Sequence, residues 1–390
     1  MNNIEDYRNL GLGLFIHFGL YSIIGKGEWV KYMHNIDDCK YGKLLNKFNP
    51  RKDWADKICK FAKKNGFKYV VLTARHHDGF SLYDTKGLNE YDSLHSKCKR
   101  DLAKEFIEAC RKYDLEPFFY HTLIDWTEEK KHKTFSSYLK YLRKSIEILC
   151  KNYGKLGGIW LDGYWKYPKA DWEDDKFYQI IKKHQPNAMI INNSGLDDLG
   201  HQINKYVTGI TFEIHNMETY DYFKYGSMYA AEMCQTLNSY WGYAENDINY
   251  KSVAELVDNI VISREHGGNL LLNIGPEKNG KIRDIDHCII DMLGKWININ
   301  KEALYLPRPI KNSNTHQVLK GENMYYIFVN LSKDNEITLR IKEKIKSIIY
   351  LDSKAPVKYE QSKTNINIKI DKFESGTNYL IRTIKIIVTQ

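Results

Sequence analysis

Lys68-Tyr-Val-Val-Leu-Thr-Ala-Arg75 is a continuous run of β-branched, aromatic and apolar residues, which is typical of a strand buried on both faces. The segment before it, 53–64, places apolar residues at helical spacing and is closed by Gly66. A helix followed by a buried strand is therefore predicted here. The same unit recurs along the chain.

The same alternation predicts seven more buried strands, at 12–17, 118–123, 158–162, 188–192, 208–213, 234–241 and 269–276. Helices are predicted between several of them, at 138–150, around 178–183 and at 252–267. Eight such strands predict an α/β fold, a (β/α)8-like barrel of the TIM type. The alternative is a doubly wound sheet, which would usually carry a Gly-rich phosphate-binding turn after its first strand. His17-Phe-Gly19 is not such a turn.

The pattern changes after about residue 300, where short alternating strands are predicted at 324–329, 337–341, 347–351 and 365–370. Polar turn residues separate them, which is typical of a small antiparallel β-sandwich. A chain of 390 residues suits two domains. We therefore expect a barrel at 1–302 and a C-terminal β-sandwich at 303–390.

Composition excludes several classes of protein. The net charge of +9 comes from lysines spread along the chain without a nucleic-acid reader motif, so no nucleic-acid partner is expected. No apolar run approaches the roughly 20 residues of a membrane helix. Seven scattered cysteines without a CxxC motif argue against a disulfide framework and a Cys-rich zinc site. With a polar N-terminal segment they predict a cytoplasmic protein, while the oligomeric state stays open.

Polar and aromatic side chains recur where the predicted barrel strands end, which is where barrel enzymes place their functional groups. These residues are His17, His76, His77, Tyr120, His121, Trp160, Asp162 and Glu213. Aromatic rings with hydrogen-bonding groups suit a sugar, which presents both C–H faces and hydroxyls. Because His76 and His77 are adjacent on a predicted strand, they are expected to point to opposite faces.

Two of these residues are carboxyl groups on different strands, Asp162 and Glu213. Carboxyl groups so placed can meet across a pocket, and retaining glycosidases hold such a pair about 5.5 Å apart. Each residue also has a structural alternative. Asp162 could cap a helix or a turn, and Glu213 could be an exposed loop residue.

Several long segments of the chain closely resemble the family 29 glycoside hydrolases, the retaining α-L-fucosidases. They are 13–22, 28–29, 68–80, 100–102, 160–163, 239–243 and 267–276, within a likeness that runs from about residue 8 to 305. The most specific are His76-His-Asp-Gly-Phe80 and Gly267-Gly-Asn-Leu-Leu-Leu-Asn-Ile-Gly-Pro276.

This resemblance implies a retaining exo-α-L-fucosidase that acts on fucosylated oligosaccharides or glycoconjugates without a metal or cofactor. It implies that Asp162 is the nucleophile and that Glu213, in Thr211-Phe-Glu213, is the acid/base; Glu232 is the runner-up and Glu218 a third option. Matching fucose-binding positions are His17, Glu28, Trp29, His76, His77, Tyr120 and Trp160, with Trp241 near the C6 methyl group.

The chain also departs from its relatives, some of which carry an Arg just after strand five where this chain has Asn192-Asn-Ser194. This difference bears on substrate preference more than on the type of reaction. Two other functions stay open: a fucose-binding relative without a working acid/base, and a metal-dependent barrel hydrolase. The second is disfavoured because adjacent histidines such as His76 and His77 chelate poorly on a strand.

Overall fold

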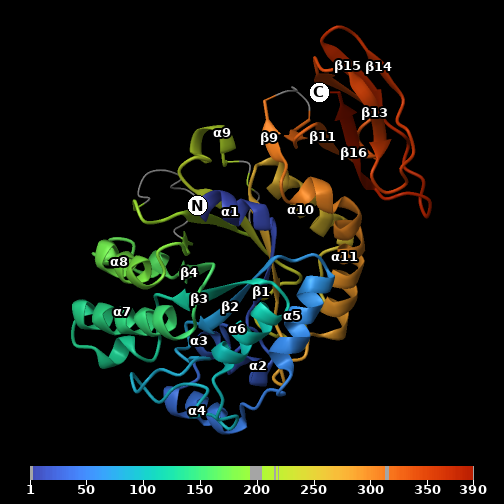
Figure 1. The fold of residues 1–390 in the computed structure, drawn as a ribbon. Helices are drawn as coiled ribbons and strands as arrows, with labels where there is room; N and C mark the ends of the chain where they lie inside the picture. Colours follow the sequence, from blue (N-terminus) through green and yellow to red (C-terminus); the bar gives the residue numbers. More distant parts are fainter. Residues whose placement is uncertain (1–2, 194–203, 215–216, 218, 312–315, 390) are drawn as a thin grey trace.

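The computed structural model describes residues 3–193, 204–214, 217, 219–311 and 316–389 (Figure 1). Eight parallel strands close into a barrel in chain order. They are β1 Leu12–Ile16, β2 Tyr69–Arg75, β3 Glu116–Thr122, β4 Gly158–Asp162, β5 Met189–Asn192, β6 Gly209–Glu213, β7 Ala230–Thr236 and β8 Asn269–Ile274. β1 pairs with both β2 and β8, which closes the ring. The predicted barrel is confirmed.

Helices lie outside the barrel (Figure 1). The longer ones are α5 Trp54–Lys64, α6 Leu102–Lys112, α7 Phe135–Asn152, α8 Asp174–His184, α10 Val253–Glu265 and α11 Asp284–Leu304. The shorter ones are α1 Asn3–Leu10, α2 Tyr21–Ile24, α3 Val30–Met33, α4 Asp38–Gly42 and α9 Tyr222–Tyr225, with 3-10 turns η1 Lys43–Lys47, η2 Glu129–Lys131 and η3 Tyr164–Lys166. Ser252 caps α10, because its side chain accepts from the Glu255 N–H at 3.1 Å.

The seventh barrel strand differs from the prediction. We expected it at 234–241, but β7 ends at Thr236 and the residues that follow belong to a loop. The strand begins at Ala230 and carries Glu232 in its interior, with an exposed fraction of 1%. A carboxyl group inside a buried strand needs hydrogen-bond donors from other elements, which sequence periodicity does not reveal. Glu232 therefore interrupts the apolar run by which a buried strand is recognised, and the strand was predicted in the wrong place.

The C-terminal region forms two antiparallel sheets, as predicted. One has the order β13-β16-β11-β10-β9 and the other β12-β15-β14. The strands are β9 Arg308–Ile310, β10 Val318–Lys320, β11 Met324–Asn330, β12 Glu336–Arg340, β13 Ile345–Tyr350, β14 Tyr359–Gln361, β15 Asn365–Lys369 and β16 Ile381–Val388. Isoleucine and valine side chains from both sheets share one apolar core, as in a sandwich.

Helix α11, which was not predicted from the sequence, joins the sandwich to the barrel. Trp296 on this helix donates from Nε1 to the Ile381 carbonyl at 2.9 Å, and Glu302 accepts from the Tyr326 hydroxyl at 3.0 Å. α11 ends at Leu304 and therefore runs across the predicted domain boundary between residues 302 and 303. This boundary stays a prediction. Figure 1 shows the sheets on this side of the barrel, beyond α10 and α11.

No helix in the described part of the chain is long and apolar enough to cross a membrane. All seven cysteines are free, although the sulfur atoms of Cys59 and Cys110 lie 3.7 Å apart.

Candidate active site

The C-terminal ends of the barrel strands surround a cavity of about 140 Å³. Its lining residues are Phe15, His17, Trp29, His76, His77, Tyr120, Trp160, Asp162, Trp165, Glu213, Cys234 and Trp241. Nine of the residues singled out from the sequence are therefore brought together, from six different strands and the loops that follow them. The arrangement is that of a barrel active site.

Asp162, the last residue of β4, is surrounded by hydrogen-bond donors. Its Oδ2 accepts from the Tyr120 hydroxyl at 2.9 Å and lies 3.3 Å from His77 Nε2. Its Oδ1 lies 3.3 Å from Trp165 Nε1 and 3.2 Å from Asn193 Nδ2. Burial by itself raises the pKa of Asp162, but the contacts with His77 and Tyr120 outweigh it and the net pKa is lowered. The carboxylate is therefore held ionised and oriented.

The pKa of Glu213, the last residue of β6, is shifted in the opposite direction to that of Asp162. Burial raises the pKa of Glu213 to about 7, and the negative charge of Asp162 contributes to the shift. The two carboxyl groups thus have pKa values displaced in opposite directions, which is the pattern of an acid and a nucleophile in one site.

The Asn193 amide, which follows β5, joins the two carboxyl groups. Its Nδ2 donates to Glu213 Oε2 at 2.6 Å and to Asp162 Oδ1 at 3.2 Å. Its Oδ1 accepts from the Thr211 hydroxyl at 2.9 Å, which fixes the orientation of the amide. Because one oxygen of each carboxyl group contacts the same nitrogen atom, Asp162 and Glu213 are neighbours across the cavity, as the two carboxyl groups of a glycosidase must be.

His17 presents a hydrogen-bond acceptor to the cavity. Its Nδ1 lies 2.6 Å from Asn273 Oδ1, and the Asn273 amide nitrogen donates to the Trp241 carbonyl at 2.7 Å. Asn273 Oδ1 therefore accepts, and the His17 proton is on Nδ1. Burial lowers the pKa of His17 to about 3, so the ring is neutral and Nε2 is free to accept from a ligand hydroxyl.

His77 is oriented by Thr122. The Thr122 hydroxyl donates to the Ile124 carbonyl at 2.6 Å and so accepts from His77 Nδ1, also at 2.6 Å. His77 Nε2 faces Asp162 Oδ2 at 3.3 Å.

The two adjacent histidines lie on the same side, contrary to the prediction. β2 ends at Arg75, so His76 and His77 lie in the loop that follows and do not alternate across a strand. Their ring centroids are 4.3 Å apart, and both rings line the cavity. Burial lowers the pKa of His76 well below its usual value, so its ring is neutral.

Aromatic rings form the walls of the cavity. Tyr120 and Trp160 stack at 5.3 Å between ring centroids, and Phe15 lies 5.4 Å from Trp160. Trp241 closes another side, 5.3 Å from the His17 ring. The walls thus combine apolar ring surface with the polar groups described above.

Below these rings the barrel interior is filled. Glu232 accepts from the hydroxyls of Tyr7 and Tyr69 and from Trp160 Nε1, the last at 3.0 Å. Burial raises the pKa of Glu232, and its side chain is not among those lining the cavity. The acid/base runner-up thus lies beneath the floor that Trp160 provides. Glu218 and Ser194 lie outside the described residues.

Glu28 also lies behind the cavity wall, with an exposed fraction of 4%. Its carboxylate accepts from the Gly242 N–H at 2.8 Å, beside Trp241. Trp29, its neighbour in sequence, lines the cavity. The expected sugar contact of Glu28 stays a prediction.

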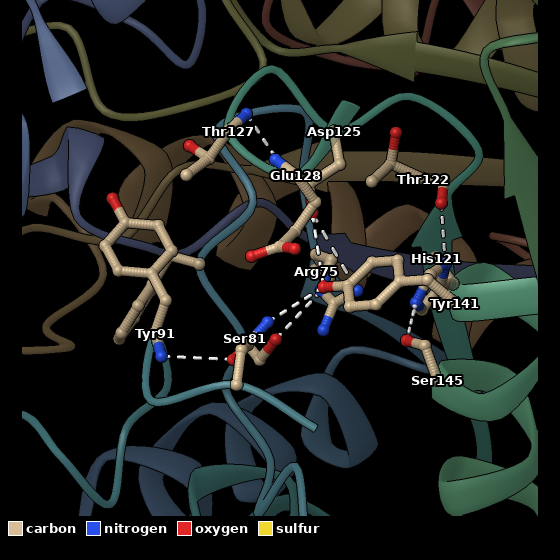
Figure 2. Close-up of polar contacts among 12 residues, drawn as sticks. Arg75, Ser81, Tyr91, His121, Thr122, Asp125, Thr127, Glu128, Tyr141 and Ser145 are labelled. Carbon is tan, nitrogen blue, oxygen red and sulfur yellow. Dashed lines mark hydrogen bonds and ion pairs between the residues drawn. The ribbon is translucent and has the colours of Figure 1, made fainter. Parts of the chain in front are cut away.

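A buried arginine, Arg75, contacts the segments that follow β2 and β3 (Figure 2). Arg75 is fully buried, donates from Nε to the Ser81 hydroxyl at 2.8 Å and lies 3.9 Å from Asp125. Its guanidinium also lies over the Tyr141 ring, 5.2 Å from the centroid.

The loop that follows β3, residues 123–128, is hydrogen-bonded to the same region. Asp125 accepts from the N–H groups of Thr127 and Glu128, at 3.0 and 2.8 Å. The Trp126 N–H donates to the His77 carbonyl at 2.9 Å. The Arg75–Asp125 ion pair therefore fixes the two loops that meet at His77. His121, a strand-end candidate, faces away from the cavity and contacts the Ser145 hydroxyl at 2.6 Å (Figure 2).

Sequence reasoning did not assign Phe15, Trp165, Asn193 and Cys234 to the site. Phe15 could have been found, since it lies two residues before His17 on one strand face. Asn193 belongs to Asn192-Asn-Ser194, which was noted only as a difference from relatives, because its contacts with two other strands cannot be read from the sequence. Among the described residues, no group of three or more metal-ligating side chains is placed to hold an ion.

An eight-stranded barrel whose strand ends hold two carboxyl groups in an aromatic cavity is an arrangement found in glycoside hydrolases. The family model described as alpha-L-fucosidase matches residues 2–302. The chain belongs to the alpha-L-fucosidase family.

Individual relatives agree with this assignment. Human tissue alpha-L-fucosidase is 29% identical over 369 residues, which cover 84% of this chain and 76% of the human protein. The structure of alpha-L-fucosidase isoenzyme 1 from Paenibacillus thiaminolyticus is similar with a TM-score of 0.84, at 26% identity and with 100% and 99% of the two chains covered. An alpha-L-fucosidase of Bacteroides thetaiotaomicron, solved as a trapped covalent intermediate, shares the fold with a TM-score of 0.85, at 24% identity over 100% and 96% of the chains.

Proposed function

We propose that this glycoside hydrolase is a retaining exo-α-L-fucosidase that removes terminal α-L-fucosyl residues from glycans or glycoconjugates. The observation that carries the proposal is the Asn193 amide between Asp162 and Glu213, which joins a carboxyl group of lowered pKa to one of raised pKa at one site. The covalent intermediate trapped in the Bacteroides relative supports the same course of reaction.

In the first step an oxygen of ionised Asp162 attacks the anomeric carbon while Glu213 donates its proton to the glycosidic oxygen. The carbon–oxygen bond to the leaving group breaks, and a fucosyl ester of Asp162 forms. In the second step Glu213, now ionised, takes a proton from water as the water attacks the same carbon. The ester bond breaks, Asp162 is released as a carboxylate, and fucose leaves with its configuration retained.

The filled barrel interior supports an exo mode of attack. Because Trp160 and the Glu232 cluster close the floor, a sugar enters only from the mouth and must be a chain end. Neutral His17 accepts from a hydroxyl, while ring faces such as that of Trp241 suit the methyl group of a 6-deoxy sugar.

The test is hydrolysis of p-nitrophenyl α-L-fucoside by the wild type and by Asp162→Asn. The variant should lose turnover by roughly 10³-fold or more while its circular dichroism is unchanged. Asp175→Asn, at an exposed residue of α8, is the matched control and should behave as the wild type. The first product should be the α-anomer by NMR.

Turnover near wild type in Asp162→Asn, or a β-anomer as first product, would contradict the proposal. Fucose binding without turnover in the wild type would instead support the fucose-binding alternative.

A further inference from the structure

The loops that follow β2 and β3 meet over a buried ion pair. Arg75 and Asp125 both have an exposed fraction of 0%, and Arg75 Nη1 lies 3.9 Å from Asp125 Oδ2 (Figure 2). Gly79, in the first loop, lies so close to the second that a Cβ there would overlap Asp125 Oδ1. The residue after Asp125 is Trp126, whose N–H donates to the His77 carbonyl at 2.9 Å. The ion pair therefore lies at the base of the contact that places His77.

This ion pair is poorly suited to stabilising the fold. Arg75 Nε donates to the Ser81 hydroxyl at 2.8 Å, but neither terminal nitrogen of the guanidinium makes a hydrogen bond with the described residues. Burial raises the pKa of Asp125, although the charge of Arg75 opposes this shift. Two charges taken out of water repay their desolvation only with close geometry and further hydrogen bonds. The pair is explained better by the loops that it holds than by the stability that it adds.

The other titratable groups around the pair do not replace either member. Those that face it from the surrounding elements are Tyr83, Tyr138, Tyr141, His121, Asp78 and Glu128. The two carboxyl groups among them contact donors other than Arg75. Glu128 pairs with Lys131 at 2.7 Å, and Asp78 accepts from the Tyr41 hydroxyl at 2.9 Å. The charges of the ion pair therefore balance each other.

His77 connects the two loops to the nucleophile. Its carbonyl accepts from the Trp126 N–H, and its Nδ1 lies 2.6 Å from the Thr122 hydroxyl at the end of β3. The opposite edge of the ring faces the reacting group, with Nε2 3.3 Å from Asp162 Oδ2. A shift of one loop relative to the other therefore moves the His77 ring relative to Asp162.

We propose that Arg75 and Asp125 are positioning residues for the reaction. Their ion pair holds the two loops where the His77 ring contacts Asp162, so that the nucleophile keeps one orientation and stays ionised. This inference rests on the proposed function, since it takes Asp162 as the group that attacks the sugar. It gives the pair a share in turnover and in pH dependence, in addition to its place in the fold.

The test removes both charges at once, in Arg75→Met/Asp125→Asn. The pair has no net charge before or after the change, and a buried ion pair can often be replaced by neutral groups without loss of the fold. We expect kcat/KM for p-nitrophenyl α-L-fucoside to fall about 10- to 100-fold, because small displacements at a reacting group cost this much. The contact with His77 lowers the pKa of Asp162, so its loosening should move the acid limb of the kcat/KM profile to higher pH.

A double-mutant cycle shows whether the effect passes through His77. In the background of His77→Ala, the same double replacement should lower kcat/KM by less than about threefold, since the ring that the pair positions is gone. Arg75→Lys keeps a positive charge opposite Asp125 and should therefore lose much less activity than Arg75→Met/Asp125→Asn.

The sandwich offers a matched control of the same chemistry. Arg382 donates to Asp352 at 2.9 and 2.7 Å, and their side chains are 6% and 14% exposed. The Arg382 guanidinium also lies over the Tyr350 ring, 3.5 Å from the centroid. Arg382→Met/Asp352→Asn should lower the melting temperature and leave kcat/KM and both limbs of the profile unchanged.

A wild-type rate and an unmoved acid limb in Arg75→Met/Asp125→Asn would overturn the inference and leave the pair a purely structural role. Equal losses with and without the His77 ring would overturn it as well. If the double variant does not fold, Asp125→Asn decides. The unpaired charge of Arg75 would by itself move the acid limb to lower pH, so a move to higher pH supports positioning, and a move to lower pH or none contradicts it.

A failure of the proposed function would look different. If the wild type hydrolysed no fucoside, that function would fall, and the affinity for fucose would be measured by calorimetry on the same variants. A loss of affinity that depends on the His77 ring would still support positioning of this ring by the ion pair, and a loss independent of it would contradict the inference.

Discussion

Replacing Asn193 by Ala should impair both steps of catalysis, because its amide contacts both carboxyl groups. In the first transition state Glu213 gives up its proton and becomes ionised, so the 2.6 Å hydrogen bond from Asn193 strengthens as the reaction proceeds. Asp162 keeps its contacts with Tyr120, His77 and Trp165, so the bond at Glu213 accounts for most of the effect.

The size of the effect follows from the charge that the amide stabilises. A hydrogen bond to a charged group contributes about 1.5–3 kcal/mol. Since about 1.4 kcal/mol corresponds to a tenfold change in rate, kcat/KM should fall between about tenfold and about 150-fold.

The pH dependence gives a second, independent readout. Glu213 must be protonated to act as the acid, and its pKa is about 7, so the activity of the wild type should fall as the pH rises through about 7. A donor favours the ionised carboxylate and lowers its pKa. Removing Asn193 therefore raises the pKa of both Glu213 and Asp162, and both limbs of the kcat/KM profile should move to higher pH.

The assay is hydrolysis of p-nitrophenyl α-L-fucoside between about pH 4 and 9. Asn192→Ala is the matched control: it removes the same amide from the neighbouring residue, whose Nδ2 contacts the Tyr178 hydroxyl at 3.2 Å outside the cavity. It should stay within about threefold of the wild type. Asn193→Ala with a wild-type rate, or with limbs that do not move, would refute the reasoning.

Three more outcomes are expected. Glu213→Gln should reduce hydrolysis of fucosyl disaccharides far more than that of fucosyl fluoride, whose leaving group needs no proton; equal losses would exclude Glu213 as the acid. Gly79→Ala should lower the unfolding free energy by about 1–3 kcal/mol and reduce kcat/KM, because Gly79 has φ 84° and a Cβ there would lie 2.4 Å from Asp125 Oδ1; unchanged melting would contradict this. Trp296→Phe should cost about 0.5–1.5 kcal/mol through loss of the bond to Ile381, measured by denaturant unfolding, with kcat/KM unchanged.

Much of the barrel follows from the sequence because a strand buried on both faces needs a continuous apolar run. The predicted strand at 158–162 coincides with β4, and the one at 68–75 differs from β2 by one residue. The three-residue strands β9, β10 and β14 could not be recognised, since so short a segment shows no period. Their pairing depends on the sheet around them.

The residues of the candidate site could also be predicted in part from the sequence. Asp162 and Glu213 could be singled out because a strand end fixes where such a residue lies in a barrel. The separation of their carboxyl groups could not, because it depends on the Asn193 amide and on the Thr211 hydroxyl that orients it. The shared direction of His76 and His77 was missed because the alternation of a strand was extended to them, although both follow Arg75, the last residue of β2.

Trp160 closes the floor of the cavity, and this closure has a kinetic consequence. A cavity with one opening makes the departure of products ordered: the leaving group must clear the mouth before water reaches the fucosyl ester, and fucose departs last. Free fucose is then expected to compete with substrate for the empty enzyme. A second sugar that reached the mouth before water would take the place of water as the acceptor of the fucosyl group.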